Sequence, residues 1–90
     1  MVFALSSPPI TPLQARLARA ALNLSLRELA ETTGLSPNTI NRFELGRGAV
    51  HAANLWRLQD VFEQRGVVFL PADEVGEATV RLGRKLDLNS

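Results

Sequence analysis

Residues 26–45 contain the start and stop positions of two short helices in close succession. Ser25 and Glu28 form the pattern of a capping box, which predicts that a helix begins directly after Ser25. Gly34 predicts the end of that helix, because glycine readily adopts the left-handed conformation that closes a helix. Ser36 predicts the cap of a second helix only two residues later. Two short helices joined by such a turn cross at a steep angle, so we expect the second one to be exposed along one side.

Two further helices are predicted on either side of this pair. Thr11 as a cap and Pro12 in the first turn predict a helix whose apolar residues recur at helical spacing, namely Leu13, Leu17, Ala20, Ala21 and Leu24. The helix after Ser36 is expected to bury Ile40 and Phe43, helped by Leu35. A fourth helix, which ends at Gly66, is predicted from Leu55, Leu58, Val61 and Phe62.

The residues after the fourth helix favour strands. Val67 to Leu70 is a run of strand-forming residues closed by Pro71, and Thr79 to Leu82 is a second run closed by Gly83. We therefore expect a mainly α fold, in which a four-helix domain is followed by two short C-terminal β-strands. The expected organisation is a flexible N-terminal arm at residues 1–10, the helical domain at 11–66, the strands at 67–83 and a tail at 84–90.

Composition argues against catalytic and metal-binding functions. The chain has 90 residues, no cysteine and a single histidine, His51. This excludes disulfide scaffolds, thiolate catalysis and metal sites built from cysteine or from several histidines. We expect no enzyme, cofactor or metal, because no pair of nucleophile and base is evident. His51 is expected to be a cap or loop residue. The connector between the two predicted strands, residues 71–77, is expected to be a solvated loop that carries the acidic residues Asp73, Glu74 and Glu77.

Charge and hydropathy leave the class of partner open. The formal net charge is only +1, and the small basic excess lies among the predicted helices. No stretch approaches the roughly 20 apolar residues that a membrane-spanning helix needs. The apolar start at residues 1–5 lacks a positive charge and is cut short by Ser6 to Pro9, unlike a signal peptide. We expect a cytoplasmic protein with no membrane partner.

One face of the helix after Ser36 has the chemistry of a DNA-reading surface. Asn38, Asn41, Arg42 and Leu45 fall at i, i+3, i+4 and i+7, opposite the predicted buried face. Asparagine pairs with adenine, arginine with guanine, and an aliphatic side chain contacts the thymine methyl group. Hydroxyl groups and free N–H groups near the helix start hold phosphates, which assigns that role to Ser36 and Thr39. For Leu45, partial burial against a loop is the competing interpretation.

Four short stretches carry a family resemblance: Leu24-Ser-Leu-Arg-Glu-Leu-Ala30, Gly34-Leu-Ser36, Thr39-Ile40, and Phe43-Glu44 with Gly46. Over roughly Leu13 to Phe62 they resemble the phage-repressor-like (Cro and XRE type) helix-turn-helix. The resemblance implies a bacterial or phage-type regulator that binds double-stranded DNA and is nucleoid-associated when bound. It also implies an internal salt bridge between Arg19 and Glu44, and a DNA-facing set made of Ser36, Pro37, Asn38, Asn41 and Arg42.

The chain departs from the family pattern at two positions. The family usually has a phosphate-binding glutamine at the first position of the second helix, and this chain has Leu26. That phosphate contact is therefore missing or replaced by Ser25 or Arg27. Pro37 occupies a position that often reads a base, so base reading is expected to shift toward Asn38 and Arg42. In the following loop, Arg47 either reaches a phosphate or is simply solvated.

The C-terminal strands predict a dimer. Both faces of the first strand are apolar, with Val67 and Phe69 on one side and Val68 and Leu70 on the other. An isolated two-stranded hairpin is also marginal in water. We expect these residues, with Val80 and Leu82, to form an antiparallel sheet shared between two subunits, although pairing within one subunit stays open. Trp56 is expected at the edge of the core or in a dimer interface. A symmetric dimer predicts a palindromic operator with half-sites about 34 to 36 Å apart.

The predicted function is a sequence-specific, dimeric DNA-binding transcriptional regulator, most simply a repressor. One alternative is an antitoxin or co-regulator, which binds its operator and also a protein partner through the arm or the acidic connector. A second is a protein-binding scaffold on the same fold, which Leu26 and the low net charge leave open.

Overall fold

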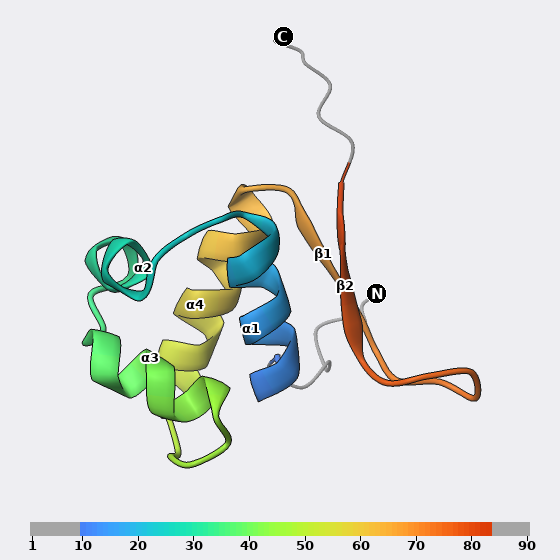
Figure 1. Ribbon diagram of the computed structural model, residues 1–90, viewed down its shortest axis with the longest axis horizontal. Helices are drawn as coiled ribbons and strands as arrows, with labels where there is room; N and C mark the ends of the chain where they lie inside the picture. The colour runs from blue at the N-terminus through green and yellow to red at the C-terminus, as the bar shows by residue number, and fades with distance from the viewer. Residues whose placement is uncertain (1–9, 84–90) are drawn as a thin grey trace, which may run out of the picture.

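The computed structural model describes residues 10–83, so the expected tail and nearly all of the expected arm lie outside the described residues. Four helices come first: α1 (Pro12–Ala21), α2 (Leu26–Thr33), α3 (Pro37–Glu44) and α4 (Ala52–Gln64). Two strands follow, β1 (Val67–Leu70) and β2 (Thr79–Leu82). The mainly α fold with two short C-terminal strands is confirmed (Figure 1). No helix in residues 10–83 is both long and apolar enough to span a membrane.

Local hydrogen bonds explain where the first two helices begin. At α1, the Thr11 hydroxyl accepts the Gln14 N–H at 3.1 Å, and the Gln14 side chain accepts the Thr11 N–H at 3.0 Å. At α2, Ser25 and Glu28 make the same reciprocal pair at 3.0 and 2.8 Å. Each box pairs N–H groups that a helix start leaves without intrahelical partners. By contrast, His51 occupies the cap position of α4 without a side-chain hydrogen bond to that helix.

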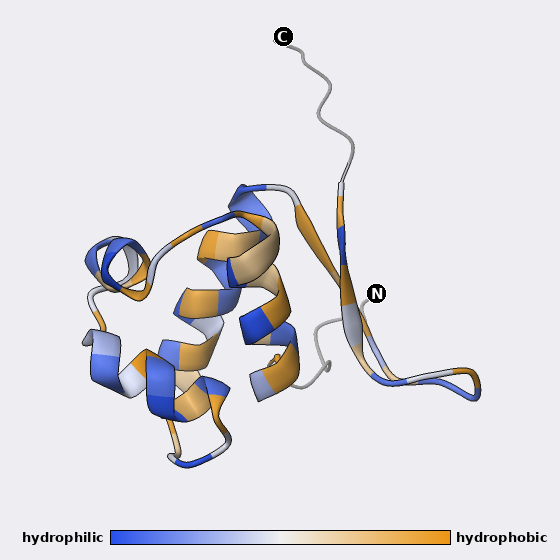
Figure 2. Ribbon diagram, in the orientation of Figure 1, coloured by the Kyte–Doolittle hydropathy of each residue, from blue (hydrophilic) through white to orange (hydrophobic). Residues whose placement is uncertain are grey.

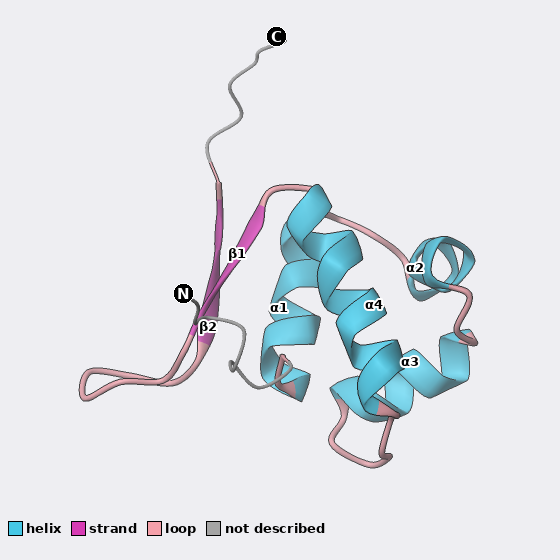
Figure 3. Cartoon of the chain, turned by 180° about the vertical axis from the view of Figure 1, so that it is seen from behind, coloured by secondary structure: helices cyan, strands magenta, loops and turns pink. Residues whose placement is uncertain are grey.

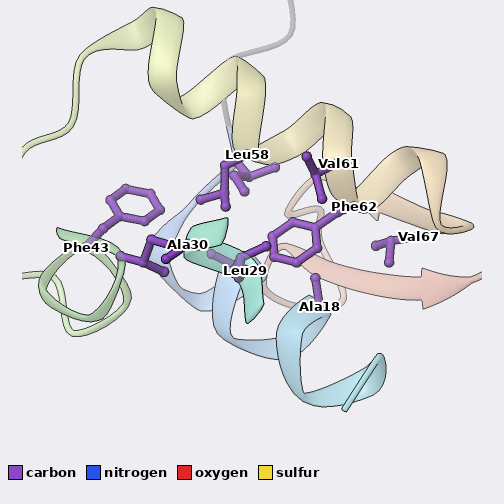
Figure 4. Packing of buried hydrophobic residues seen from close by; sticks show 11 residues of the cluster. Ala18, Leu29, Ala30, Phe43, Leu58, Val61, Phe62 and Val67 are labelled. Carbon is purple, nitrogen blue, oxygen red and sulfur yellow. The ribbon is translucent and has the colours of Figure 1, made fainter. Parts of the chain in front are cut away.

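The core gathers side chains from all four helices and from β1. Phe62, Leu29, Ile40 and Leu58 are its largest fully buried apolar residues. Figure 4 shows Phe62 of α4 directed toward Leu29 of α2 and Ala18 of α1. The buried faces predicted for α3 and α4 are therefore confirmed, with Leu35 and Leu55 packed against the core from its edge. Trp56, also on α4, is 41% exposed.

The predicted apolar face of α1 was wrong at Leu13, Ala20 and Ala21, whereas Leu17 is half-buried and Leu24, past the end of the helix, packs against the core. The helix buries Gln14, Ala15 and Ala18, whereas Leu13 is 36% exposed and Ala20 and Ala21 are exposed. Two apolar stripes run along α1, and hydropathy favours the one with the larger side chains. The structure instead buries the stripe of alanines at 0% exposure, because small side chains let α1 approach its neighbours closely.

The two strands form an antiparallel hairpin within one chain, with Val67 opposite Leu82 and Leu70 opposite Thr79. The hairpin lies beside α1, and its connector, residues 71–78, extends away from the helices (Figures 1 and 3). Figure 2 shows β1 as hydrophobic and the connector as mostly hydrophilic. The two sides of β1 differ in burial, since Val67 is 3% and Val68 44% exposed.

Part of the predicted dimer interface already belongs to the core of one subunit. Val67 is buried there, and Phe69 and Val80 pack against the same core. The Phe69 ring meets Phe62 edge-on, with ring centroids 6.1 Å apart. These three residues therefore make contacts within one subunit, and the interface between subunits stays a prediction. The other members of the predicted set, Val68, Leu70 and Leu82, do not belong to this core cluster; Val68 and Leu82 are exposed and Leu70 is half-buried.

Candidate nucleic-acid interface

The turn between α2 and α3 is held by backbone geometry and by one buried hydroxyl. Gly34 has φ of +81°, a left-handed conformation, and its N–H donates to the Ala30 carbonyl at 2.8 Å. The Thr33 side chain, in a residue only 2% exposed, donates to the Leu29 carbonyl at 2.8 Å. The same oxygen accepts the Leu35 N–H at 3.2 Å. This network fixes the direction in which the chain leaves α2 and enters α3.

Arg57 of α4 adds a contact that sequence analysis missed. Its Nη1 atom donates to the Thr33 carbonyl at 3.2 Å. That carbonyl lies at the C-terminal end of α2, where the carbonyl groups lack intrahelical partners and the helix dipole favours a positive charge. A side chain at Gly34 would place its Cβ 3.5 Å from the same nitrogen. Arg57 therefore ties the turn to α4, and no local pattern predicts a contact between residues 24 positions apart.

The start of α3 presents hydroxyl groups. The Ser36 oxygen accepts the Thr39 N–H at 3.0 Å and caps the helix. The Ser36 hydroxyl donates to the Thr39 hydroxyl oxygen at 2.8 Å, so Thr39 still has its own proton to donate. Pro37 occupies the first turn and lacks an N–H group. The arrangement suits an anion such as a phosphate at this end of α3.

The outward side of α3 is polar, and its inward side is apolar. Asn38 and Arg42 are exposed and Asn41 is half-buried, whereas Ile40 and Phe43 are 1% and 7% exposed on the opposite side. Leu45, just past the helix, is 48% exposed, so about half of its surface reaches solvent. Figure 1 shows α2 and α3 on one side of the molecule, with α1 and α4 between them and the hairpin.

Arg42 lies against the loop that follows α3. Its Nη2 atom donates to the Arg47 carbonyl at 3.2 Å. Gly48 of this loop lies beside Arg42, since a Cβ there would be in van der Waals contact with the Cβ and the Nε of Arg42, 3.4 Å from each. A guanidinium has five N–H donors, which leaves most of them for another acceptor. The Arg47 side chain is exposed in the same loop.

The start of α2 is less suited to a phosphate than the start of α3. Leu26 packs against the core from its edge, and Arg27 is exposed. The Ser25 oxygen is used as a cap, and the Glu28 carboxylate accepts the Ser25 N–H. A carboxylate at this helix end competes with a phosphate for the same positive dipole. Ser25 and Arg27 are the two predicted replacements for the missing contact between glutamine and phosphate, and of these two Arg27 has a positive charge.

An ion pair between half-buried Arg19 and buried Glu44 links α1 to α3. Arg19 Nε donates to Glu44 Oε2 at 2.8 Å and Nη2 donates to Oε1 at 2.9 Å, a bidentate geometry. Arg19 Nη1 also donates to the Leu24 carbonyl at 3.0 Å. The hydrogen bond to Glu44 and its negative charge raise the pKa of Arg19 above its ordinary value, against the opposing effect of burial. Arg19 therefore has a structural role, since its guanidinium is committed inside the domain.

Comparison with known proteins identifies the family. No curated protein matches the chain. The helix-turn-helix family of the Cro/C1 and XRE type matches residues 16–66, which include α2, the turn, α3 and all of α4. The match covers more than half of the chain and contains the whole polar side of α3. This protein belongs to the Cro/XRE-type helix-turn-helix family of DNA-binding regulators.

Proposed function

We propose that this protein is a repressor that reads a palindromic operator as a homodimer. The observation that carries the proposal is the exposed polar side of α3 on a rigidly held turn. Asn38, Asn41 and Arg42 supply the donors and acceptors that base edges in the major groove require. The proposed DNA-binding set also includes the phosphate-binding and flanking residues, namely Ser25, Arg27, Ser36, Pro37, Thr39, Leu45 and Arg47.

Low net charge favours two copies of the domain on DNA. Phosphate contacts supply most of the non-specific affinity, and the chain has a formal net charge of only +1. Two copies of the domain on one operator make twice as many phosphate contacts, although each copy keeps the same low net charge. The outward face of β1 carries Val68, which is 44% exposed, and half-buried Leu70, and these two residues form the centre of the proposed dimer surface. Leu82, which is 49% exposed, pairs with Val67 and therefore lies on the other face of the hairpin.

The position of the hairpin bears on operator spacing. The longest axis of the subunit is 34 Å, and α3 and the hairpin lie toward opposite ends of it (Figure 1). A dimer centred on the hairpin therefore separates its two recognition helices widely. Half-sites one turn apart (about 34 Å) or two turns apart both place the helices on one side of the DNA. The operator test below includes both spacings.

The test is selection of bound duplexes from a random library at near-physiological salt. Wild type is compared with an Asn38→Ala, Arg42→Ala double variant and with Arg65→Ala, which removes one exposed charge at the far end of α4. We expect a palindromic site that is enriched by wild type and by Arg65→Ala but not by the double variant. Melting curves show whether all three proteins are folded. No enrichment by folded wild type, or equal enrichment by the double variant, contradicts the proposal.

A second candidate is a co-regulator that also binds a protein, and the connector supports it. The Asp73 carboxylate accepts the N–H groups of Val75 and Gly76 at 2.8 and 3.0 Å, which orders the tip. Val75 is 95% exposed there, close to the exposed acidic side chains of Glu74 and Glu77. The test is binding to the protein encoded next to this gene. A Val75→Ser variant that keeps operator binding and loses the partner supports this role, and unchanged partner binding contradicts it.

A further inference from the structure

Gln14 is a buried polar residue whose side chain makes three hydrogen bonds. The residue is 5% exposed on α1. Its Oε1 accepts the Thr11 N–H at 3.0 Å, as part of the capping box. Its Nε2 donates to the Leu70 carbonyl at 3.0 Å and to the Thr79 carbonyl at 3.1 Å. Both amide protons are therefore used on the hairpin, one on each strand, and this exceeds what a capping box requires.

The two bonds hold the connector end of the hairpin, whereas apolar packing holds its inward face along Val67, Phe69 and Val80. Leu70 and Thr79 face each other at the last pair before the connector. At the opposite end of β1, Val67 is 3% exposed in the core. Apolar contacts have little directionality, whereas hydrogen bonds weaken steeply when their angles change. Packing of Val67, Phe69 and Val80 therefore attaches the hairpin, and the Gln14 amide sets the direction in which its connector end extends.

The same helix holds α3. Arg19, five positions after Gln14 on α1, binds Glu44 at the C-terminal end of α3 through two bonds of 2.8 and 2.9 Å. One short helix thus carries a directional attachment to the hairpin and another to the recognition helix. Because α1 is a continuous helix from Pro12 to Ala21, the two attachments keep a constant separation.

We propose that Gln14 is a positioning residue that sets the angle between the hairpin and α3, and thereby the half-site spacing that the dimer accepts. The spacing part rests on the proposed hairpin-centred dimer, whereas the angle itself is a property of one subunit. Loss of the amide donor lets the connector end of the hairpin change its angle on the packed side chains of Val67, Phe69 and Val80, while the helical domain stays intact.

The discriminating variant is Gln14→Glu. A glutamate keeps the acceptor for the Thr11 N–H, as Glu28 does for Ser25, but replaces the donor with an oxygen that repels both strand carbonyls. Glu28→Gln is the matched control, because it makes the reverse change in the capping box of α2, where the side chain is exposed and binds only the Ser25 N–H among residues 10–83. Gln14→Met, which is apolar and of similar length, is used if Gln14→Glu does not fold.

The first measurement needs no DNA. Residual dipolar couplings report the orientation of the hairpin relative to the helices, and amide exchange reports its opening. In the Gln14 variant we expect strand amides to exchange about tenfold faster while helix amides are unchanged, and the strand couplings to fit a different or averaged orientation. In Glu28→Gln we expect both to match wild type. Strand couplings that fit the wild-type orientation in the Gln14 variant overturn the proposal.

The second measurement is affinity for palindromes whose half-site spacing varies by single base pairs around one and two turns. We expect wild type and Glu28→Gln to prefer one spacing. The Gln14 variant should bind a single half-site with normal affinity, but its preference among spacings should fall to about twofold or shift to a different spacing. An unchanged spacing profile overturns the spacing part. If wild type shows no spacing preference, both the spacing part of the proposal and the proposed dimer are overturned. The residual dipolar couplings still decide the role of Gln14 within one subunit.

Discussion

Removing Arg19 should destabilise the protein more than removing its partner Glu44, although both changes break the same ion pair. The Glu44 side chain is 2% exposed, whereas the Arg19 side chain is 24% exposed. Arg19→Met leaves a buried carboxylate without its two donors and leaves the Leu24 carbonyl without the bond from Nη1. Glu44→Ala leaves an arginine that keeps the Leu24 bond and reaches water. The two variants therefore differ in how much unpaired charge stays buried.

The expected magnitudes follow from that difference in burial. Breaking a buried ion pair by removing one partner costs about 3 to 5 kcal/mol. We assign about 4 kcal/mol to Arg19→Met, near the middle of that range, and about 2 kcal/mol to Glu44→Ala, because solvent screens the arginine that remains. A domain of this size unfolds with roughly 5 to 15 kcal/mol, and each kcal/mol lowers Tm by about 4 to 8 °C. Arg19→Met should therefore melt roughly 16 to 32 °C below wild type.

The assay is urea unfolding followed by the fluorescence of Trp56, the single tryptophan of the chain, which lies on α4. Arg16→Met is the matched control, since Arg16 is exposed on the same helix and its loss should change stability by less than about 0.5 kcal/mol. An Arg19→Met, Glu44→Leu double variant should recover most of the loss, because no buried charge remains. A Glu44→Ala cost equal to or larger than that of Arg19→Met would refute the reasoning.

Four other substitutions test the site, the turn and the hairpin. Arg42→Ala should cost about 1 to 3 kcal/mol of specific binding and relax the preference at one base pair, so an unchanged preference in the duplex selection removes it from base reading. Gly34→Ala should lower the unfolding free energy by about 1 to 2 kcal/mol in urea, because φ of +81° strains any residue with a Cβ, and a neutral result means that the turn relaxes. Val68→Lys should break the dimer in sedimentation without changing the melting of the subunit, whereas Phe69→Asp should lower melting because Phe69 packs on Phe62. A fully dimeric Val68→Lys would place the interface elsewhere.

The sequence by itself determined the local elements, and in particular the helix boundaries around the turn. Ser25 with Glu28, Gly34, and Ser36 predicted the ends of α2 and the start of α3, and the structure forms each of these caps. Such predictions succeed because a cap joins atoms only three residues apart, so it depends little on the rest of the chain. The exposed side of α3 followed from the same local information, because the helical period separates the polar stripe from Ile40 and Phe43.

Only the tertiary structure decided which stripe of α1 is buried and how the elements are held together. Hydropathy favoured the stripe that contains Leu13 and Leu17, but close packing selected the stripe with Ala15 and Ala18, and a single sequence contains no information on the distance between helices. The contacts of Arg57 with the turn and of Gln14 with the hairpin join residues 24, 56 and 65 positions apart. Their partners are backbone carbonyls, which every residue possesses, so no side-chain pattern marks them in advance. These attachments exist only after the fold has brought the carbonyls into place, and they determine how α3 and the hairpin are oriented.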